Sequence, residues 1–411
     1  MSATITTTVE VLFDGSTATD ISDRVQNVTI TYGRQRILDE FGAGTATVTI
    51  ENRDNFITPG HSDSTYGNTQ LIGREVFISA AVTGGSDSHA TYLFRGIVQD
   101  VDYIPSVDHQ NATTVLKLVD GFEKLARAKF ENENFAEQLT SARVSAVLDL
   151  ASINYPNGSN PLDRSIQTGS QTCLADTAVT SGALDYLQKI TRTENGRFVV
   201  NHAGTPSATN KGGVLTFTAQ NSGTGTSGLT ISDANTLASG SVQAESLNLE
   251  YGSELLFNAY SFTPHTGAVQ SGSDATSITK YGRRTVSRET LSDAASTNNA
   301  GIYFLNLHTE PMLRISSVTI RIDEATTADA EKLLHLHVTS GIDLNITPAG
   351  SSTAIDAEYM VEGVSLNITP RDMATNASTI IATYSTSAAD ATGYWVLEDP
   401  VLGVLPTILA P

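Results

Sequence analysis

The chain has 411 residues and a mass of 43.5 kDa, a length that accommodates about two to three domains. Asp and Glu number 44 against 24 Lys and Arg, and the formal net charge of -20 argues against a protein that grips nucleic acid phosphates or an anionic membrane surface. A single cysteine, Cys173, excludes an internal disulfide and a cysteine-rich zinc site. The sequence starts without a basic and an apolar segment, and no apolar run approaches ~18 residues, so we expect neither a conventional signal peptide nor a membrane span.

The N-terminal part, residues 1–125, is predicted to consist of β-strands. Short runs rich in Val, Ile, Thr, Phe and Tyr are separated by Gly, Asn, Asp and Ser, which is typical of all-β proteins. In Ala46–Asn52, the apolar Val48 and Ile50 alternate with polar residues, as in a strand that buries one face. We therefore predict a β-barrel or sandwich. The other predicted strands are Val25–Gly33, Glu75–Gly85, Thr91–Ile104 and Thr113–Gly121.

Residues 126–240 combine two predicted helices with strands, so we assign them to an α+β domain. The first helix lies in Ser141–Ile153, with Ser141 as its N-cap and apolar residues at helical spacing. The second lies in Ser181–Gly196, where the final glycine ends it. A strand, a long polar loop and a returning strand follow. Residues 221–246 are rich in Ser, Gly, Thr and Ala and are predicted to be a connecting loop.

The β pattern returns in residues 241–370, which we assign to a second β-barrel-like domain that non-contiguous segments could build. Two helices are predicted within it, one starting near Asp293 and one over Ala328–Leu336. Residues 371–411 add a strand at Thr379–Ser387 and an apolar tail. The predicted fold class is mainly β with an α+β insertion, as two similar β-barrel-like domains plus a helix-containing domain. The strands predicted for the second β domain are Leu247–Gly252, Leu255–Pro264, Arg314–Ile322, Ile342–Pro348 and Glu358–Pro370.

Two segments far apart in the chain share a pattern. Tyr92–Pro105 and Glu358–Pro370 each contain apolar residues, a glycine (Gly96 and Gly363), alternating apolar residues and a proline. Each follows a strand and a Ser/Gly-rich loop, and each precedes another strand. The repetition suggests that the first and third regions carry similar β-domains, with a chance likeness between β-hairpins as the alternative.

Motifs for phosphate or nucleophile chemistry are weak. The sequence contains no HExxH, GxSxG or GxxxxGK[ST]. Gly223–Gly228 matches the dinucleotide fingerprint, but a strand-like segment follows it where a helix is required, so a loop is expected. Carboxylate pairs such as Asp100/Asp102 and Glu131/Glu133 arise by chance among 44 acidic residues, and a glycosidase pair stays open.

Metal ligands are also sparse. On a strand, His335 and His337 would share a face and could form half of a metal site, with Asp343 or Glu331 as further ligands. The surrounding LLHLHV favours a helix end with half-buried histidines instead. Cys173 is expected to be a buried cysteine, with a threefold thiol cluster in a trimer as the alternative. We therefore predict no catalytic, cofactor-binding or metal-binding residues and no cofactor.

Several segments carry patterns that occur in this order in one known family. Val28–Gly60 runs from a strand and a Gly-Arg through a small-residue turn and an alternating strand to an Asn-x-Asp turn. Tyr92–Tyr103 and Val115–Ala126 supply the next strands, and Leu184–Gly204 supplies a helix, an Asn-Gly turn and a strand. Together they resemble the minor tail or baseplate-hub proteins of long-tailed bacteriophages. The other similar segments are Ser277–Leu291, as a Tyr-Gly-Arg strand before a helix, Glu310–Ile320, Met360–Asp372 and Ala391–Leu405.

The resemblance implies a non-enzymatic virion protein at the tail tip, made in the host cytoplasm. It implies a homotrimeric hub whose two similar β-domains per chain give a pseudo-sixfold face towards the tail tube. The implied partners are a second and third copy of the chain, distal tail or tail tube proteins, tail tip or fibre proteins, and the tape measure protein. DNA would pass through during ejection without specific binding, and no membrane anchor is expected.

Other interpretations stay open at this stage. A hexameric distal tail ring protein differs from the hub in its number of subunits. A carbohydrate-binding tail adhesin would need exposed aromatic residues, yet aromatics make up 7% of the chain and Trp395 is the single tryptophan. A polysaccharide-degrading enzyme would need an essential carboxylate pair. The acidity fits a channel that repels DNA phosphates, but it equally serves solubility.

Overall fold

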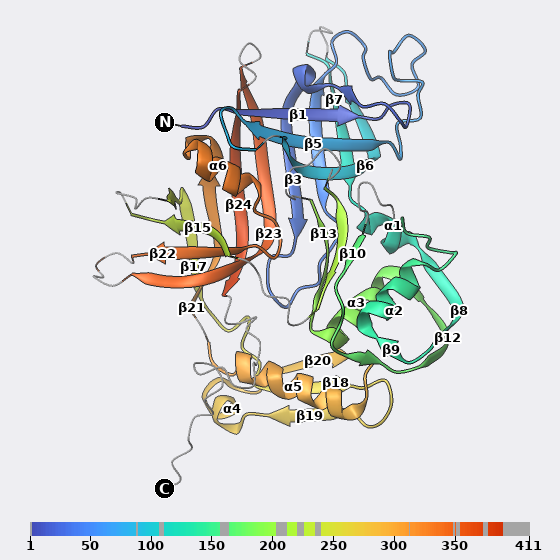
Figure 1. Ribbon diagram of the computed structural model, residues 1–411, viewed down its shortest axis with the longest axis vertical. Helices are drawn as coiled ribbons and strands as arrows, with labels where there is room; N and C mark the ends of the chain where they lie inside the picture. Colours follow the sequence, from blue (N-terminus) through green and yellow to red (C-terminus); the bar gives the residue numbers. More distant parts are fainter. Residues whose placement is uncertain are drawn as a thin grey trace.

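The structure is a computed structural model (Figure 1). It describes residues 2–87, 89–106, 111–156, 164–202, 212–219, 226–234, 240–311, 313–347, 350, 354–372 and 377–388. Strands dominate this part of the chain, and most of them belong to one fourteen-stranded sheet. Smaller sheets and most of the helices lie beside and below this sheet in the view of Figure 1.

Eight strands of the large sheet close into a barrel. They are β1 (Ile5–Val11), β3 (Val25–Gly33), β4 (Thr45–Glu51), β5 (Glu75–Val82), β6 (Thr91–Ile104), β7 (Thr113–Val119), β23 (Ile355–Asp372) and β24 (Ala377–Ala388). Their order around the barrel is β23-β3-β4-β7-β6-β5-β1-β24, and β24 pairs back onto β23. Every second residue of β1 is buried, as expected for a strand with one face towards a barrel interior. The short strand β2 (Thr19–Asp20) pairs with β1.

The same two C-terminal strands also form the centre of a second, open sheet. Its other strands are β15 (Thr226–Ser232), β16 (Ser241–Gln243), β17 (Ser246–Tyr251), β21 (Leu313–Arg321) and β22 (Gly341–Ile346). The order is β16-β15-β22-β23-β24-β21-β17, so β16 and β17 are the edges within the described residues. Helix α6 (Thr327–Leu334) packs between this sheet and β5 of the barrel.

Strand β23 is long enough to serve both sheets. Its first part pairs with β22, from Ile355 opposite Ile346 to Met360 opposite Gly341. Its second part pairs with β3, beginning with Gly363 opposite Gly33. A shift in its register with β24 lies between these two parts. The β23–β24 hairpin therefore passes from one sheet into the other.

An α+β insertion follows the barrel strand β7. Helix α3 packs on α1 and α2, and the strands form three small sheets, β8 with β12, β9 with β11, and β10-β14-β13. In Figure 1 this insertion lies beside the barrel. Its elements are α1 (Phe122–Arg127), β8 (Lys129–Phe135), β9 (Gln138–Leu139), α2 (Thr140–Leu148), β10 (Arg164–Ile166), β11 (Thr172–Cys173), β12 (Asp176–Gly182), α3 (Ala183–Glu194), β13 (Arg197–Asn201) and β14 (Val214–Thr218).

A third unit lies between β17 and β21. Helix α5 covers a three-stranded sheet of order β19-β18-β20, and Tyr260, Phe262 and Phe304 form its own small apolar core. In Figure 1 it lies below the large sheet. Its elements are β18 (Ala259–Thr263), β19 (Gln270–Ser273), α4 (Ala275–Tyr281), β20 (Thr285–Glu289) and α5 (Ala294–His308). Two 3-10 turns, η1 (Ser22–Arg24) and η2 (Ile322–Glu324), complete the described elements.

The fold class predicted from the sequence is confirmed, because the chain is mainly β, contains a closed ring of strands and carries an α+β insertion. The second β region is an open sheet that shares a hairpin with the barrel. Boundaries at residues 125, 240 and 370 stay a prediction. Among the described residues, no helix is long and apolar enough to cross a membrane.

The starts of α5 and α6 were predicted close to their capping residues, whereas α4, which the Asp274 carboxylate caps, was not predicted. Helix α5 begins after Asp293, whose carboxylate accepts a hydrogen bond from the Ser296 N–H at 2.7 Å. Helix α2 is different, because Leu139 precedes it and Ser141 lies inside it. Helix α3 ends at Asn195, which adopts a left-handed φ of 53°, one residue before the expected glycine.

One longer expectation was wrong and another was correct only in part. Residues 221–246 were predicted to be a connecting loop, yet β15 and β16 lie within them and place Leu229, Ile231 and Val242 in the core. Small polar residues on the outward positions conceal this strand pattern. The segment Ser277–Leu291 was compared with a strand before a helix, and β20 does precede α5, but the first part of the segment lies in α4.

The close approach of β3 and β23 gives a prediction about Gly33. This residue has a φ of 94°, and a Cβ placed there would lie 2.4 Å from the Glu362 carbonyl oxygen and 2.7 Å from the Gly363 Cα. We expect Gly33→Ala to lower the free energy of unfolding by at least about 2 kcal/mol, because it adds both backbone strain and a backbone clash. Gly42→Ala, where a Cβ meets nothing within 4 Å, is the matched control. Urea unfolding followed by circular dichroism measures both, and equal midpoints would contradict the prediction.

Candidate interaction sites

The shared hairpin contains a buried cluster of charged groups. Glu362 of β23 is fully buried, and its carboxylate accepts hydrogen bonds from Arg34 Nε at 2.7 Å and from Ser387 Oγ at 2.6 Å. Arg197 of β13 approaches the same carboxylate to 4.0 Å. These residues come from the segment after β3, from both strands of the hairpin and from the insertion. The cluster therefore joins three parts of the fold.

The environment of Glu362 keeps its carboxylate charged. Burial alone raises the pKa of Glu362, but Arg34, Arg197 and the Ser387 hydroxyl outweigh burial and hold this pKa below its ordinary value of 4.5. A carboxyl group with a lowered pKa stabilises the folded state above its ordinary pKa. That contribution is lost as the pH falls through the folded pKa.

A second buried pair joins the barrel to the insertion. His202, directly after β13, places Nε2 at 3.3 Å from Asp120 Oδ2. The Asp120 carboxylate also accepts hydrogen bonds from the Gly44 N–H at 2.7 Å and the Phe122 N–H at 2.9 Å. The imidazole stacks on Phe94 with ring centroids 4.5 Å apart. No motif links these residues, because the paired histidine and aspartate are 82 positions apart.

A long loop after β4, residues 52–74, lies at one end of the barrel (Figure 1). Asn52 is buried and donates hydrogen bonds to the Ile57 carbonyl oxygen at 2.7 Å and to Thr114 Oγ1 at 3.0 Å. Its side-chain oxygen accepts a hydrogen bond from the Ile57 N–H at 3.0 Å. The Asn52 side-chain amide thus forms hydrogen bonds both within the loop and with β7. The asparagine belongs to the Asn-x-Asp turn singled out in the sequence.

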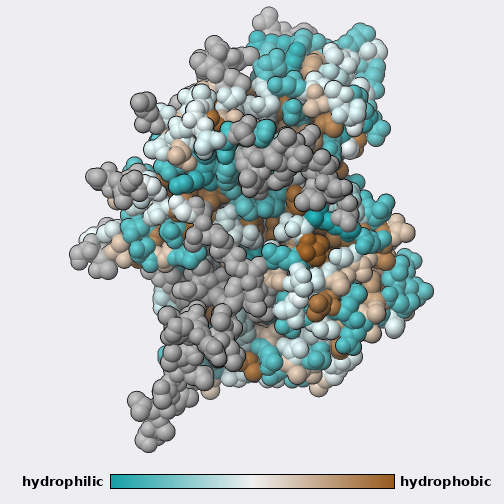
Figure 2. Space-filling view, in the orientation of Figure 1, coloured by the Kyte–Doolittle hydropathy of each residue, from teal (hydrophilic) through white to brown (hydrophobic). Residues whose placement is uncertain are grey.

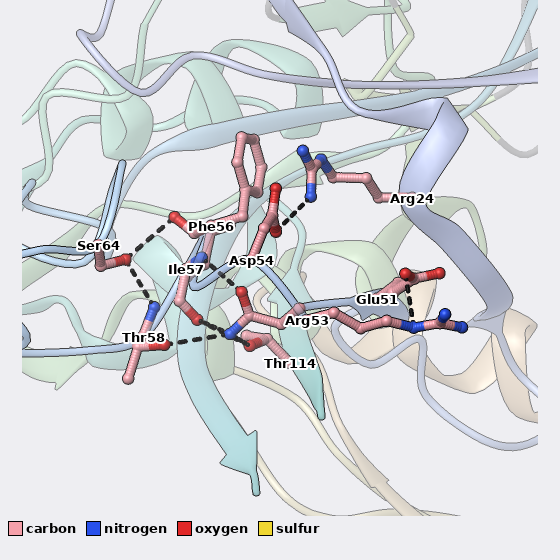
Figure 3. Close-up of polar contacts among 10 residues, drawn as sticks. Arg24, Glu51, Arg53, Asp54, Phe56, Ile57, Thr58, Ser64 and Thr114 are labelled. Carbon is pink, nitrogen blue, oxygen red and sulfur yellow. Dashed lines mark hydrogen bonds and ion pairs between the residues drawn. The ribbon is translucent and has the colours of Figure 1, made fainter. Parts of the chain in front are cut away.

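Further contacts fix the outer part of this loop. Ser64 Oγ accepts a hydrogen bond from the Thr58 N–H at 2.9 Å and donates one to the Phe56 carbonyl oxygen at 3.1 Å (Figure 3). Arg24 pairs with Asp54 at 2.7 Å, and its guanidinium lies 4.1 Å from the Phe56 ring centroid. The loop is therefore a defined structure that presents fixed side chains.

Exposed apolar residues lie on and beside this loop. Ile72 and Ile104 are both 52% exposed, and Tyr103 is 37% exposed. Ile104 ends β6 opposite Thr113, and Thr113 pairs with Glu51, the residue from which the loop starts. We call the loop, residues 52–74, together with Tyr103 and Ile104 the rim surface. Apolar residues are scattered over the face of the molecule that Figure 2 shows. Those on a structured loop are available for contact with another protein.

The residues considered as metal ligands in the sequence make other contacts. The Glu331 carboxylate accepts hydrogen bonds from the Ser86 hydroxyl and the Asp87 N–H, and Asp343 lies on β22. His335 ends α6, and its Nε2 lies 3.0 Å from Asp87 Oδ2. The His337 Nδ1 contacts the His335 carbonyl oxygen at 2.9 Å. Burial lowers the pKa of His337. Within the described residues, no group of three or more His, Cys, Asp or Glu side chains could hold a metal ion.

The other candidates are also separate. Cys173 is buried, and burial raises the pKa of its thiol to about 12. Asp100 and Asp102 both pair with Lys117 on the outer face of β7, at 3.3 and 2.6 Å. The pair Glu131/Glu133 lies on β8. Residues 223–225 of the glycine motif and the tail 389–411, with Trp395, lie outside the described residues.

The two similar hairpins found in the sequence both belong to the barrel. Tyr92–Pro105 includes β6, which pairs with β7, and Glu358–Pro370 lies in β23, which pairs with β24. A Cβ at Gly96 would lie 2.6 Å from the Val119 carbonyl oxygen, and one at Gly363 would lie 2.5 Å from the Arg34 carbonyl oxygen. Both glycines allow a neighbouring backbone to approach closely.

Comparisons with known proteins find similarity in structure. No family model matches the chain, and no curated protein matches its sequence. The tail protein from Neisseria meningitidis MC58 is 12% identical with a TM-score of 0.59, and the match covers 95% of this chain and 98% of that one. The 43 kDa tail protein of prophage MuSo2 from Shewanella oneidensis is 12% identical with a TM-score of 0.53, covering 94% and 98%. The chain has the fold of phage tail proteins.

A third similar structure comes from a PdpA-VgrG complex. A chain in a structure of a PdpA-VgrG complex is 8% identical with a TM-score of 0.50, and the match covers 95% of this chain and 65% of that one. The resemblance inferred from short sequence segments is confirmed at the level of the fold. Sequence reasoning missed the Glu362 cluster and the His202 pair, because each joins segments that are distant in the chain.

The first prediction for these sites concerns pH and Glu362. At pH 7, Glu362→Gln is expected to lower the free energy of unfolding by about 3 kcal/mol, because it leaves Arg34 buried beside a neutral group. The difference between variant and wild type should shrink once the pH falls below the ordinary glutamate pKa of 4.5 and through the lowered pKa of the native Glu362 carboxylate.

Urea midpoints measured by circular dichroism at pH 7 and pH 4 test this expectation. Glu310→Gln, which removes an exposed partner of Lys280, is the control and should leave the midpoint nearly unchanged. A destabilisation by Glu362→Gln that is the same at every pH would contradict the assignment.

The second prediction concerns the loop. Asn52→Ala is expected to lower the free energy of unfolding by about 2 kcal/mol, because the Ile57 N–H and carbonyl lose their buried partner. Trypsin should then cleave faster at Arg53 and Arg74. Arg53→Lys, which keeps the trypsin site and changes an exposed side chain, is the control. Unchanged stability and cleavage rates in Asn52→Ala would show that the amide does not hold the loop.

Proposed function

We propose that the chain is a structural, non-enzymatic component of a phage-like tail. In this proposal it forms a homotrimeric hub that connects the tail tube or distal tail ring to the tail tip. The observation that carries the proposal is the match of this fold to the Neisseria and Shewanella tail proteins, which covers 95% and 94% of this chain. Interfaces rather than a catalytic centre would then perform the function.

The open sheet supports assembly with other copies of the chain. Its edge strand β17 pairs with β21 on one side, and no strand of the described residues pairs with its other side. Tyr251 on β17 is 69% exposed and Leu249 is 38% exposed. Edge strands with free backbone groups and apolar side chains readily pair with another chain. Closed threefold symmetry would cover three such edges.

The rim surface supports contact with neighbouring tail proteins. Its loop is held rigid by Asn52 and Ser64 and exposes Ile72, Tyr103 and Ile104. A rigid loop loses little conformational entropy when a partner binds it. In this proposal the hub contacts tail tube or distal tail proteins on one side. On its other side it contacts tip, fibre or tape measure proteins.

The charge supports a conduit for DNA. Three chains at -20 each carry a formal charge of -60. Acidic groups around a channel repel phosphates, so DNA would pass through during ejection without binding. This part of the proposal requires the acidic residues to line the threefold axis.

Multi-angle light scattering of the purified chain tests the assembly. Three chains of 43.5 kDa give about 130 kDa, the expected mass. A double variant, Leu249→Lys and Tyr251→Lys, should lower this mass towards that of one chain, because two charged side chains would replace the apolar ones at the edge. The double variant Ile72→Lys and Tyr103→Lys should leave the mass unchanged, since the rim surface faces other proteins.

Other measured masses, or an enzymatic activity, would favour a different function. A mass near 261 kDa, six chains of 43.5 kDa, would replace the hub with a hexameric distal ring. A mass of 43.5 kDa at every concentration tested would contradict self-assembly. Hydrolysis of a polysaccharide by the purified chain, abolished when one carboxylate is replaced, would contradict the non-enzymatic role.

A further inference from the structure

A cavity of about 480 Å³ lies where three parts of the fold meet. One wall is the segment after β3, another is the end of α3 with the start of β13, and the third is formed by β20 and α5. Aromatic side chains supply much of the apolar lining, and they are Phe41, Phe198, Phe257 and Phe304. The volume is in the range of natural ligand pockets.

The cavity is positively charged although the chain is strongly acidic. Four arginines line it, and they are Arg34, Arg192, Arg197 and Arg288. Two acidic residues, Asp39 and Glu40, share the lining, and Glu362 lies behind it as the buried partner of Arg34 and Arg197. Arg192 pairs with Glu40 at 2.7 Å. Burial, followed by the charge of Arg288, lowers the pKa of His308 to about 4, so this wall residue is neutral at pH 7. One positive charge remains in excess.

The excess charge is that of Arg288. Within the described part of the chain, its guanidinium makes neither a hydrogen bond nor an ion pair. It lies over Phe304 at 4.9 Å and Phe262 at 5.9 Å from the ring centroids. Burial, followed by the nearby charges of Arg192 and Arg34, lowers the pKa of Arg288 to about 10. The Arg288 side chain is half-buried, so its guanidinium offers donors that an anion inside the cavity can accept.

The surroundings define which anion fits. A guanidinium offers parallel N–H donors that match a carboxylate. A phosphate carries up to two negative charges, whereas the cavity has one excess positive charge and retains Asp39 and Glu40. The aromatic walls favour an apolar body beside the anionic group. A carboxylate attached to an apolar group satisfies both features.

We propose that this cavity, the Arg288 pocket, binds a carboxylate carried on an apolar or aromatic body. Two sources share this chemistry: a free organic acid, and a Glu or Asp side chain flanked by apolar residues in a peptide segment. The Arg288 guanidinium holds the carboxylate, and the phenylalanine walls hold the apolar part. The inference does not depend on the proposed role in a tail.

Isothermal titration calorimetry on the full chain tests the pocket with two pairs of probes. The first pair is 3-phenylpropionate and its neutral amide, 3-phenylpropanamide. The second pair is the blocked peptides acetyl-Phe-Glu-Phe-amide and acetyl-Phe-Gln-Phe-amide. We expect the charged member of at least one pair to bind with 1:1 stoichiometry, at least about tenfold more tightly than its neutral counterpart. A preference within the first pair alone indicates a free acid, and a preference within the peptide pair indicates a protein segment.

Variants at Arg288 connect the binding to this residue. Arg288→Met should abolish the preference for the charged probe, whereas Arg288→Lys, which keeps the charge, should retain part of it. Arg53→Met, an equal loss of charge at an exposed site, should bind like the wild type. Without ligand, Arg288→Met should melt at the same temperature as the wild type or higher, because an unpaired charge is replaced by an apolar side chain. Equal binding of acids and amides, or an unchanged preference in Arg288→Met, would overturn the proposal.

Discussion

The pairing of one hairpin with two sheets is the constraint on which this structure depends. Strand β23 has 18 residues and spans about 60 Å at roughly 3.3 Å per residue. That length lets its first part complete the open sheet and its second part close the barrel beside β3. A shorter strand would leave either the barrel open or the second sheet without its centre. The relative position of the two sheets is therefore set by backbone hydrogen bonds along a single strand.

The polar groups at this junction follow from the same constraint. Where β3 and β23 begin to pair, Gly33 and Gly363 face each other and allow the backbones to approach closely. Glu362 lies next to this contact and is inaccessible to solvent. Its carboxylate is therefore stabilised by Arg34, Arg197 and Ser387. Such a buried network adds little net stability, but it penalises any other register because a shift would leave a charge unpaired.

The sequence predicted those elements whose position depends on interactions between residues close together in the chain. Asp293 marked the start of α5 because a carboxylate caps free N–H groups, and the alternation of Val48 and Ile50 marked β4. Strands β15 and β16 were not predicted, because their outward residues are small and polar and the strand β22 with which β15 pairs is distant in the sequence. The likeness of the β6 and β23 segments indicated two related hairpins, yet it could not show that one of them belongs to both sheets.

The candidate sites were less predictable from the sequence, because their residues are far apart in the chain. The Arg288 pocket is assembled from residues near positions 34–41, 188–198 and 286–308, which no spacing rule connects. The rim loop was partly visible, since its Asn-x-Asp turn is a local pattern with a local hydrogen-bonding role. Which charged side chain pairs with which depends on the tertiary structure. The sequence supplies the number of charges but not their partners.

The shared hairpin also determines the order in which the molecule can mature on the ribosome. Strands β1 and β3 leave the ribosome early, but their neighbours in the barrel, β24 and β23, are encoded more than 300 residues later. At about 5–20 residues per second, the nascent barrel waits for roughly 15–70 s with two unpaired flanks. During that interval the flanks can pair with strands of another nascent chain. Because the closing strands come last, a chain broken off before residue 355 cannot complete the barrel, so only nearly full-length products are competent for assembly.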